Sequence, residues 1–292
     1  MQVVRVVVCV LCALILAITL IALGAAIAIN STVLNPEFIA SELEDVDIHL
    51  MLADQAKQEI PPALSFLNPI IDDAAVDLEP WIREQVLTVL HAVNAYLRGE
   101  QEFRIVISVE EAKSYLITRL NEVLISSPPP GFPQIPEGEV DAFVRVIEQE
   151  LDAHIPDVLH IEESDLDEQT MAELRNARQL TSYLTTSLRV LPVIAVLMIL
   201  VIALVLGWRS RPLSRYVGAS FVLAGSLCLG VVLVVRSVLP AMMSPEVPSE
   251  VATALPDFIS GISHPLVVYG AVVLLVGVGL VILSFRLKAS EY

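Results

Sequence analysis

The sequence predicts a membrane protein that is mainly α-helical, with four transmembrane helices and a mostly helical domain inserted between the first helix and the second. Of the 292 residues, 55% are hydrophobic, and apolar runs of about 20 residues occur four times. A helix of that length crosses the ~30 Å hydrocarbon core of a bilayer. The inserted stretch, residues 31–186, has periodic apolar positions among many charged ones, and its pattern is of the α+β kind with minor strand content.

The first apolar run, residues 6–29, contains no charged residue. Two interpretations fit it: a retained anchor, or a signal peptide cleaved at the small-x-small site Ala26-Ile27-Ala28. We favour the anchor, because the apolar region of a signal peptide has about 7 to 15 residues, roughly half of this run. The predicted organisation is a transmembrane helix (1–30), an acidic extracytoplasmic domain (31–186) and a three-helix transmembrane region (187–292) with spans at about 190–208, 217–235 and 266–285.

Basic residues that flank the spans predict the orientation of the chain. Three arginines and no acid join the second span to the third: Arg209, Arg211 and Arg215. The connection after the third span, residues 237–265, has three acidic residues and no Lys or Arg. Because Lys and Arg are retained on the cytoplasmic side during insertion, we expect a multi-pass plasma-membrane protein with both termini in the cytoplasm and residues 31–186 outside.

Two further arginines, Arg189 and Arg236, lie at the outer ends of predicted spans. Long cationic side chains at such positions reach lipid headgroups or pair with nearby acids, so we assign both a structural role. A functional site is the alternative interpretation, because ionisable residues near a membrane are costly unless they are used.

The charge of the chain is divided unevenly. Residues 31–188 hold 30 Asp and Glu against 9 Lys and Arg, whereas the rest of the chain holds 4 against 8. A field of that sign repels nucleic acid and favours cations or basic partners, although a merely soluble surface has the same composition. The expected partners are therefore the lipid bilayer and, at the inserted domain, another envelope protein or a basic ligand; a homo-oligomer is compatible with the sequence. The three cysteines all lie in predicted spans, so no disulfide framework holds the inserted domain.

Helix signals open the inserted domain. Asn35-Pro36-Glu37 combines an N-cap residue, a proline at the first helical position and an acid in the first turn. Another helix is expected to follow from Asp47 to Ile60. The clearest helix covers residues 80–98, with apolar residues on one face and Gly99 just past its end.

A strand and a helix follow, and the same order then repeats. Residues 103–107 are β-branched and alternating, which predicts a strand, and Ser108-Val109-Glu110-Glu111 predicts a capping box that opens the next helix. After the proline-rich run 127–136 come a helix at about 140–153, a short apolar stretch at 158–161 and a further helix from about residue 164. Helix, strand, helix thus occurs twice, and we expect the two strands to pair; coincidence in a mostly helical domain is the alternative.

The last helix of the domain has no glycine or proline from Asp165 to Val190, so we expect one helix to run from about Asp165 to Trp208. Pro192 would lie inside it and bend it, because proline removes a backbone hydrogen bond and crowds the preceding turn. In the 237–265 connection, separate helical turns are expected to begin near Ser249 and at Pro256, with Phe258, Ile259 and Ile262 away from water.

Candidate ligand residues are few. His154, His160 and Glu150 offer imidazole and carboxylate groups in a short window, but Pro156 separates the two histidines and their spacing matches no zinc motif. Ordinary surface residues are the preferred interpretation, and no cofactor is expected. The apolar runs contain no Asp, Glu or His of the kind that pumps place near the membrane midplane.

Three functional classes remain open from the sequence. The favoured one is a non-enzymatic envelope protein that binds, senses or scaffolds through its extracytoplasmic domain, because that domain alone has a varied surface. The first alternative is a channel or transporter component, which conductance in liposomes would reveal. The second is a membrane-bound enzyme, which would need the His154 and His160 region to assemble with distant acids.

Overall fold

Four helices of the computed structural model are long and apolar enough to cross a membrane: Val3–Ser31, Glu168–Val205, Ser210–Val238 and Ile259–Arg286. The structure describes residues 2–43, 47–59, 68–126, 137–242 and 249–286. The chain is therefore a mostly helical, multi-pass membrane protein by length and composition, which confirms the coarse prediction. The run 127–136, predicted to be a loop, lies outside the described residues.

Two compact units divide the chain. The first, which we call the bundle unit, combines residues Met1–Glu42 with Gln179–Tyr292, and the second, the sheet unit, comprises Leu43–Arg178. These divisions follow backbone contacts, whereas the domain boundaries predicted from the sequence refer to the membrane surface. The predicted boundaries at 30/31 and 186/187 therefore stay predictions.

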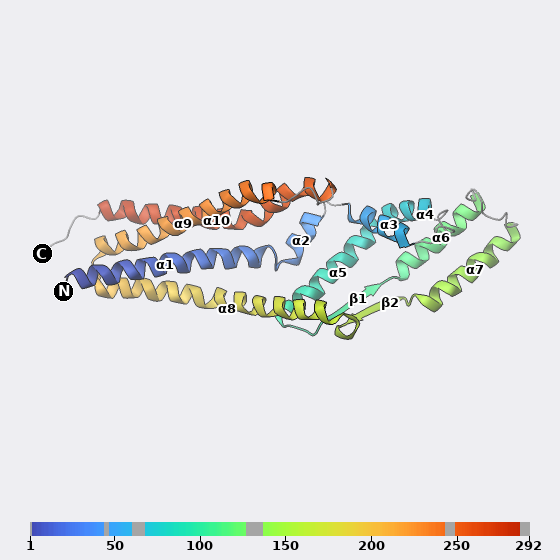
Figure 1. Ribbon diagram of the computed structural model, residues 1–292, viewed down its shortest axis with the longest axis horizontal. Helices are drawn as coiled ribbons and strands as arrows, with labels where there is room; N and C mark the ends of the chain where they lie inside the picture. Colours follow the sequence, from blue (N-terminus) through green and yellow to red (C-terminus); the bar gives the residue numbers. More distant parts are fainter. Residues whose placement is uncertain (1, 44–46, 60–67, 127–136, 243–248, 287–292) are drawn as a thin grey trace. The chain divides into compact units, whose positions relative to one another are not determined.

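The long helices of the bundle unit run side by side (Figure 1); they are α1 (Gln2–Ser31), α8 (Glu168–Val205), α9 (Ser210–Met242) and α10 (Ser249–Arg286). Buried side chains from all four form its core: Leu16, Leu20, Ala195, Ile202, Val217, Ala224 and Val273. The short helix α2 (Pro36–Leu43) follows α1, and the backbone N–H of Glu37 donates to Asn35 Oδ1 at 3.2 Å. The predicted cap at Asn35 is therefore confirmed.

Helix α8 contains Pro192, as predicted, but it ends at Val205 and does not reach Trp208. Gly207 takes a positive φ of 65°, and the N–H groups of Gly207 and Trp208 bond back to the carbonyls of Leu204 and Ala203. This is the glycine-terminated arrangement that closes many helices. The prediction of a helix through Trp208 was wrong because the capping role of Gly207 was overlooked.

The connection before the last span also differs from the prediction. Helix α10 runs without interruption from Ser249 through Pro256, so the separate turns expected there are parts of one long helix. Ile259 is buried and Ile262 is half-buried, as expected for an apolar face turned from water. The side chain of Phe258 lies outside the described part of the chain.

The sheet unit combines helices of at most 20 residues with two strands (Figure 1). In chain order its elements are α3 (Ile48–Glu59), α4 (Asn68–Asp77), α5 (Glu79–Arg98), β1 (Arg104–Ser108), α6 (Glu110–Ser126), α7 (Glu137–His154), β2 (Val158–Glu162), the 3-10 turn η2 (Glu163–Asp165) and the first turns of α8. Helix α5 ends at Arg98 and is capped by Gly99, which has a φ of 74°, as its sequence predicted.

Strands β1 and β2 pair in antiparallel fashion, from Arg104 opposite Glu162 to Ser108 opposite Val158. The predicted meeting of the two short strands is thus confirmed. Because side chains alternate across a strand, one face of the pair packs on the core and the other faces water. The core face contributes Ile105, Ile107 and Ile161, which pack with Tyr96 and Phe103 among others. Arg104, Val106, His160 and Glu162 are exposed.

Candidate binding site of the sheet unit

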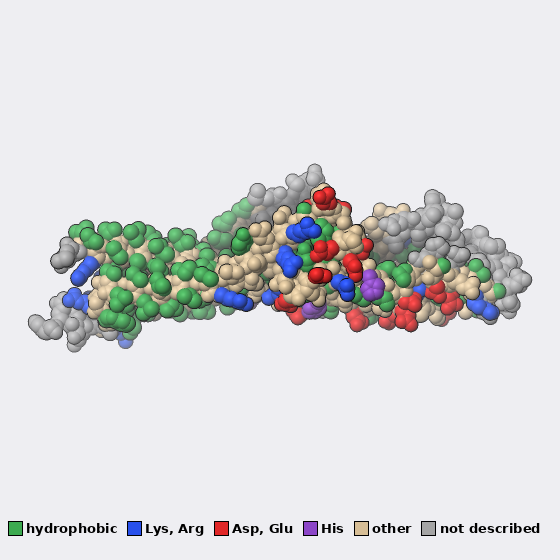
Figure 2. All heavy atoms as spheres, turned by 90° about the horizontal axis from the view of Figure 1, so that it is seen from below, with side chains coloured by type: hydrophobic (Ala, Val, Ile, Leu, Met, Phe, Trp, Pro, Cys, Tyr) green, Lys and Arg blue, Asp and Glu red, His purple; other side chains and the backbone are tan. Residues whose placement is uncertain are grey.

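Most of the cationic side chains of the sheet unit form ion pairs. Five Lys or Arg side chains lie within ion-pair distance of Asp or Glu: Lys57, Arg83, Arg104, Lys113 and Arg119. Most Asp and Glu side chains of the unit are exposed to solvent. On the face drawn in Figure 2, acidic side chains gather over the sheet unit, whereas hydrophobic side chains cover the bundle helices. The unit therefore presents a surface of excess negative charge.

Lys113 on α6 is the most enclosed of these cations, with a side chain only 8% exposed. Its Nζ donates to Asp152 Oδ1 at 2.5 Å, to Asp157 Oδ1 at 2.7 Å and to the Ile155 carbonyl at 3.0 Å. Hydrogen bonds from these two carboxylates raise the pKa of Lys113 above its ordinary value. The ammonium thereby fastens the α7–β2 connection to α6, which is a structural task.

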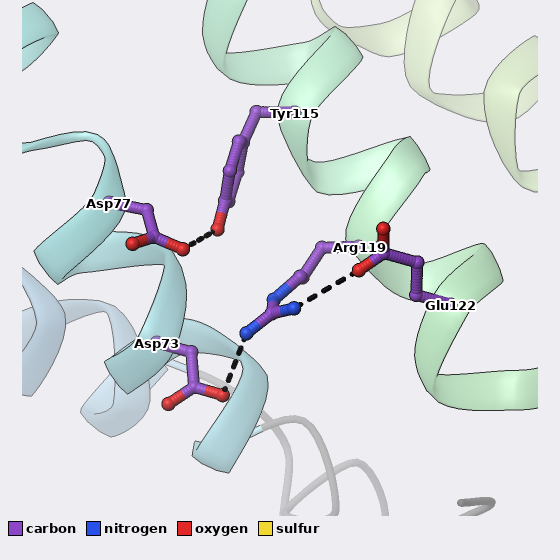
Figure 3. Close-up of polar contacts among 5 residues, drawn as sticks. All are labelled: Asp73, Asp77, Tyr115, Arg119 and Glu122. Atoms are coloured by element: carbon purple, nitrogen blue, oxygen red, sulfur yellow. Dashed lines mark hydrogen bonds and ion pairs between the residues drawn. The ribbon is translucent and has the colours of Figure 1, made fainter. Parts of the chain in front are cut away.

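A second polar cluster joins α6 to α4 (Figure 3). The Tyr115 hydroxyl donates to Asp77, and Arg119 reaches Asp73 on α4 at 3.5 Å and Glu122 on its own helix at 3.0 Å. Burial, followed by the bond to Asp77, raises the pKa of Tyr115. The cluster has paired partners on both helices, so it too holds the fold together.

A polar hollow of about 750 Å³ opens at the end of the sheet where Arg104 and Glu162 meet. We call it the sheet hollow, and its lining residues are Gln101, Glu102, Phe103, Arg104, Glu162, Glu163, Ser164 and Arg178. Its volume falls within the range of small-molecule sites, roughly 300–1,000 Å³. A smaller hollow of about 440 Å³, which includes His91, shares Gln101 and Arg104 with it.

An aromatic pair fixes one side of the sheet hollow. Tyr96 and Phe103 are buried and meet edge to face, with ring centroids 5.6 Å apart. The Arg178 guanidinium lies over the Tyr96 ring, 4.9 Å from its centroid. Gly99, just past the end of α5, lies beside it, and a Cβ there would be at van der Waals distance, 3.4 Å, from Arg178 Nη2. Stacking therefore holds a planar cation in the lining.

The charges of the sheet hollow are only partly paired. Arg104 Nη2 lies 3.2 Å from Glu162 Oε1, which joins the first residue of β1 to the last of β2. Within the described residues, Arg178, Glu102 and Glu163 have no ion-pair partner, although all three line the same hollow. A cation and two anions thus face one space without neutralising each other.

Of the three predicted metal candidates, only His160 has a side chain that the structure describes, so the predicted grouping stays a prediction. His160 is exposed on β2 opposite Val106, and no group of three or more His, Cys, Asp or Glu that suits a metal occurs among the described residues. Glu150 and His154 belong to α7, and their side chains lie outside the described residues.

The predicted structural residues lie at helix ends and surfaces of the bundle unit. Arg236 on α9 donates from Nε to Ser263 Oγ at 2.8 Å and from Nη2 to the Ser260 carbonyl at 3.3 Å, which ties α9 to α10. The Arg215 guanidinium lies 5.7 Å from the centre of the Phe285 ring. Four further residues are exposed: Arg189 and Pro192 on α8, Arg209 between α8 and α9, and Arg211 on α9.

Hydroxyl groups inside the spans bond to backbone carbonyls. Ser220 donates to the Ala13 carbonyl at 2.8 Å, and Tyr269 donates to the Leu20 carbonyl at 2.8 Å. Both bonds join α1 to a later helix, and Thr19 bonds within its own helix. Groups that are satisfied in this way fit helix packing better than an ion pathway.

Sequence reasoning missed Lys113 and Arg178, since a lone basic residue forms no motif. Comparisons with protein-family models, with curated proteins and with solved structures found no match. The function is therefore inferred from the charges and geometry of the chain itself.

Proposed function

We propose that this chain is a non-enzymatic binding protein of the cell envelope, which four spans anchor in the plasma membrane and which binds a basic partner through its sheet unit. One observation carries the proposal. Most of the described cations of the sheet unit, such as Lys113 and Arg119, pair with acids of the same unit, while most of its described acids are exposed to solvent. The partner is a basic segment of another envelope protein or a cationic ligand.

The proposal includes an orientation, with both chain ends in the cytoplasm and the sheet unit outside. It rests on Arg209, Arg211 and Arg215 between α8 and α9, because basic connections stay on the cytoplasmic side. Single cysteines at Glu111 and Arg211 test it in intact cells with a membrane-impermeant maleimide. We expect labelling at position 111 and protection at 211 until the membrane is opened, whereas the reverse pattern refutes the orientation. Unsubstituted protein reports any labelling of the cysteines in the spans.

Electrostatic binding of this kind has a definite signature. Exposed charges attract a cation over about one Debye length, ~10 Å at 0.1 M salt, so affinity falls as salt rises. The full chain in nanodiscs of zwitterionic lipid avoids charge from the bilayer itself. A lysine-rich peptide of about twelve residues with an amidated C-terminus is then the probe, and a glutamate-rich peptide of the same length is its matched control.

We expect the lysine-rich peptide to bind at low salt, to weaken about tenfold or more between 50 and 200 mM salt, and to outcompete the glutamate-rich peptide. Replacing the exposed acids Glu110, Glu111 and Glu148 together by Gln should also weaken the binding of the lysine-rich peptide at a fixed salt concentration. Equal binding of the two peptides, or no binding of either, would remove the proposed function.

A further inference from the structure

We infer that the sheet hollow binds a molecule that carries one carboxylate and two or more ammonium groups, the chemistry of free lysine or of a short lysine-bearing peptide with a free C-terminus. This inference rests on the proposed function and names the ligand class that one site of the sheet unit takes. It starts from the three unpaired charges of the hollow, those of Arg178, Glu102 and Glu163.

Arg178 is the group of the site that binds the carboxylate of the ligand. Its guanidinium carbon lies over the ring of Tyr96, 4.9 Å from the ring centroid, and within the described residues it has no carboxylate partner. An arginine fixed in this way keeps its fork of N–H donors available, and a carboxylate fits that fork with two parallel hydrogen bonds. Because stacking has already restricted the side chain, little conformational entropy remains to be lost on binding.

Glu102 and Glu163 are the groups of the site that bind the ammonium groups of the ligand. They flank the sheet on the loop before β1 and in η2 after β2, and both line the hollow. Neither forms an ion pair with a described Lys or Arg, so two negative charges face the space that Arg178 also faces. With Arg104 and Glu162 paired to each other, the unpaired charges of the lining sum to one excess anion, so a matching ligand carries more ammonium groups than carboxylates.

Other ligand classes fit these charges less well. A phosphate or nucleotide would meet three glutamates for two arginines in the lining. A diamine would satisfy the glutamates and leave Arg178 without an acceptor. A dicarboxylate would satisfy Arg178 and meet two uncompensated carboxylates. Only a ligand that carries a carboxylate and a larger number of ammonium groups can form an ion pair with each of the three unpaired side chains.

Calorimetry of the full chain in zwitterionic nanodiscs tests the inference with four probes: L-lysine, trilysine with a free C-terminus, trilysine amide and cadaverine. We expect trilysine to bind about tenfold more tightly than its amide, since a charge-assisted bond to arginine is lost on amidation. Lysine should likewise bind more tightly than cadaverine, which has no carboxylate. The stronger of lysine and trilysine identifies which source of the shared chemistry the site prefers.

Two substitutions separate the roles of the lining residues. Arg178→Gln should abolish the preference for the free carboxylate, so that trilysine and its amide bind alike, and Arg178→Lys should restore part of it. Glu163→Gln should weaken both peptides about equally. Glu84→Gln removes the same charge on α5, outside the hollow, and should leave the preference for the carboxylate unchanged. Thermal melting of each variant verifies that it folds.

Equal binding of trilysine and its amide to the unsubstituted chain would overturn the inference, as would a preference that survives Arg178→Gln. If the amidated twelve-residue lysine-rich peptide still binds in a salt-dependent way in that case, the acidic surface stands and only the hollow is refuted. If that peptide also fails to bind, the proposed function falls with it.

Discussion

Lys113 is a cation that the sheet unit encloses and pairs twice, with Asp152 and Asp157. A lysine that loses most of its water must find hydrogen-bond acceptors, and here two carboxylates and the Ile155 carbonyl supply them. Removal of the ammonium would leave the two acids close together without their counter-ion. The residue therefore matters more for the fold than its isolated place in the sequence indicates.

The raised pKa of Lys113 predicts how stability depends on pH. A group whose pKa is higher in the folded state contributes stability that is fully present below its unfolded pKa, about 10.4, and that is lost as pH rises through the folded value. We expect the melting temperature to fall above about pH 10.

Arginine stays charged throughout this range, so Lys113→Arg should show a smaller fall over the same interval. Tyr115, whose pKa is also raised, loses its proton in the same window, so both proteins are compared in a Tyr115→Phe background. Parallel melting curves for the lysine and arginine proteins would contradict the assignment.

Residue-level prediction from the sequence worked where a rule is local and failed where a contact is distant. The caps at Asn35 and Gly99 depend on neighbouring backbone groups, and both are present. Arg178, by contrast, lies over the ring of Tyr96 and beside Gly99. These two residues belong to α5 and to the cap of that helix. No pattern near residue 178 reveals those partners.

At the scale of elements, β1 and β2 were predictable because both are short apolar runs, Ile105-Val106-Ile107 in β1 and Val158-Leu159-His160-Ile161 in β2. Helix α4 was missed, although Ile71, Ala74, Ala75 and Leu78 have helical spacing and the last three are buried. Alanine adds little to an apolar pattern, so the face was not recognised. The expected capping box at Ser108 is also absent in its predicted form: Ser108 belongs to β1, and the first helical bond runs from Lys113 N to the Val109 carbonyl.

Close packing of α9 against α10 requires small residues at their contact. A Cβ on Gly225 would lie 2.6 Å from Leu274 N and 2.7 Å from the Gly270 carbonyl, which are backbone atoms that cannot turn aside. We expect Gly225→Val to destabilise the bundle by about 1–3 kcal/mol, the usual cost of overpacking.

Gly230 on the same helix is the matched control, because a Cβ there would meet no atom within 4 Å. Gly230→Val should leave stability nearly unchanged. Thermal unfolding of both variants in the same detergent measures the difference. Similar losses for the two would show that helix propensity, and not the contact with α10, sets the cost.

Helix α8 is the element that begins in one unit and ends in the other, with Pro192 inside it. Proline at an interior position bends a helix, so we expect Pro192→Ala to straighten α8. Spin labels at the exposed positions Glu173 and Leu204 should then move apart, which pulsed dipolar spectroscopy measures. An unchanged distance would exclude a bend at this proline.

At the scale of the whole molecule, the composition of the sequence predicted that most acidic residues and the long apolar runs lie in different parts of the chain. Four helices satisfy the spanning criterion, and the acids concentrate in the sheet unit. The boundaries between units were harder to foresee. The compact units divide after Glu42 and after Arg178, inside segments where hydropathy changes gradually and no glycine or proline marks a break.

The sheet unit should fold without the spans, because the buried contacts that define it are internal. Tyr96, Phe103 and Ile105 form one core cluster, and Leu124 forms a second with Val140 and Val144. All six lie between Leu43 and Arg178, and no cysteine lies in that range. A fragment of residues 43–178 should therefore give a helical circular-dichroism spectrum and one cooperative melting transition.

Tyr96 provides the internal control for that fragment, since it is 1% exposed and contacts both Phe103 and Arg178. Truncation of a buried aromatic side chain to alanine costs about 3–5 kcal/mol, a large share of the ~5–15 kcal/mol that stabilises a domain. Tyr96→Ala should thus lower the midpoint steeply or abolish the transition. A helical fragment that melts without cooperativity, and is indifferent to this substitution, would mean that the sheet unit takes its stability from the bundle and is not an independent domain.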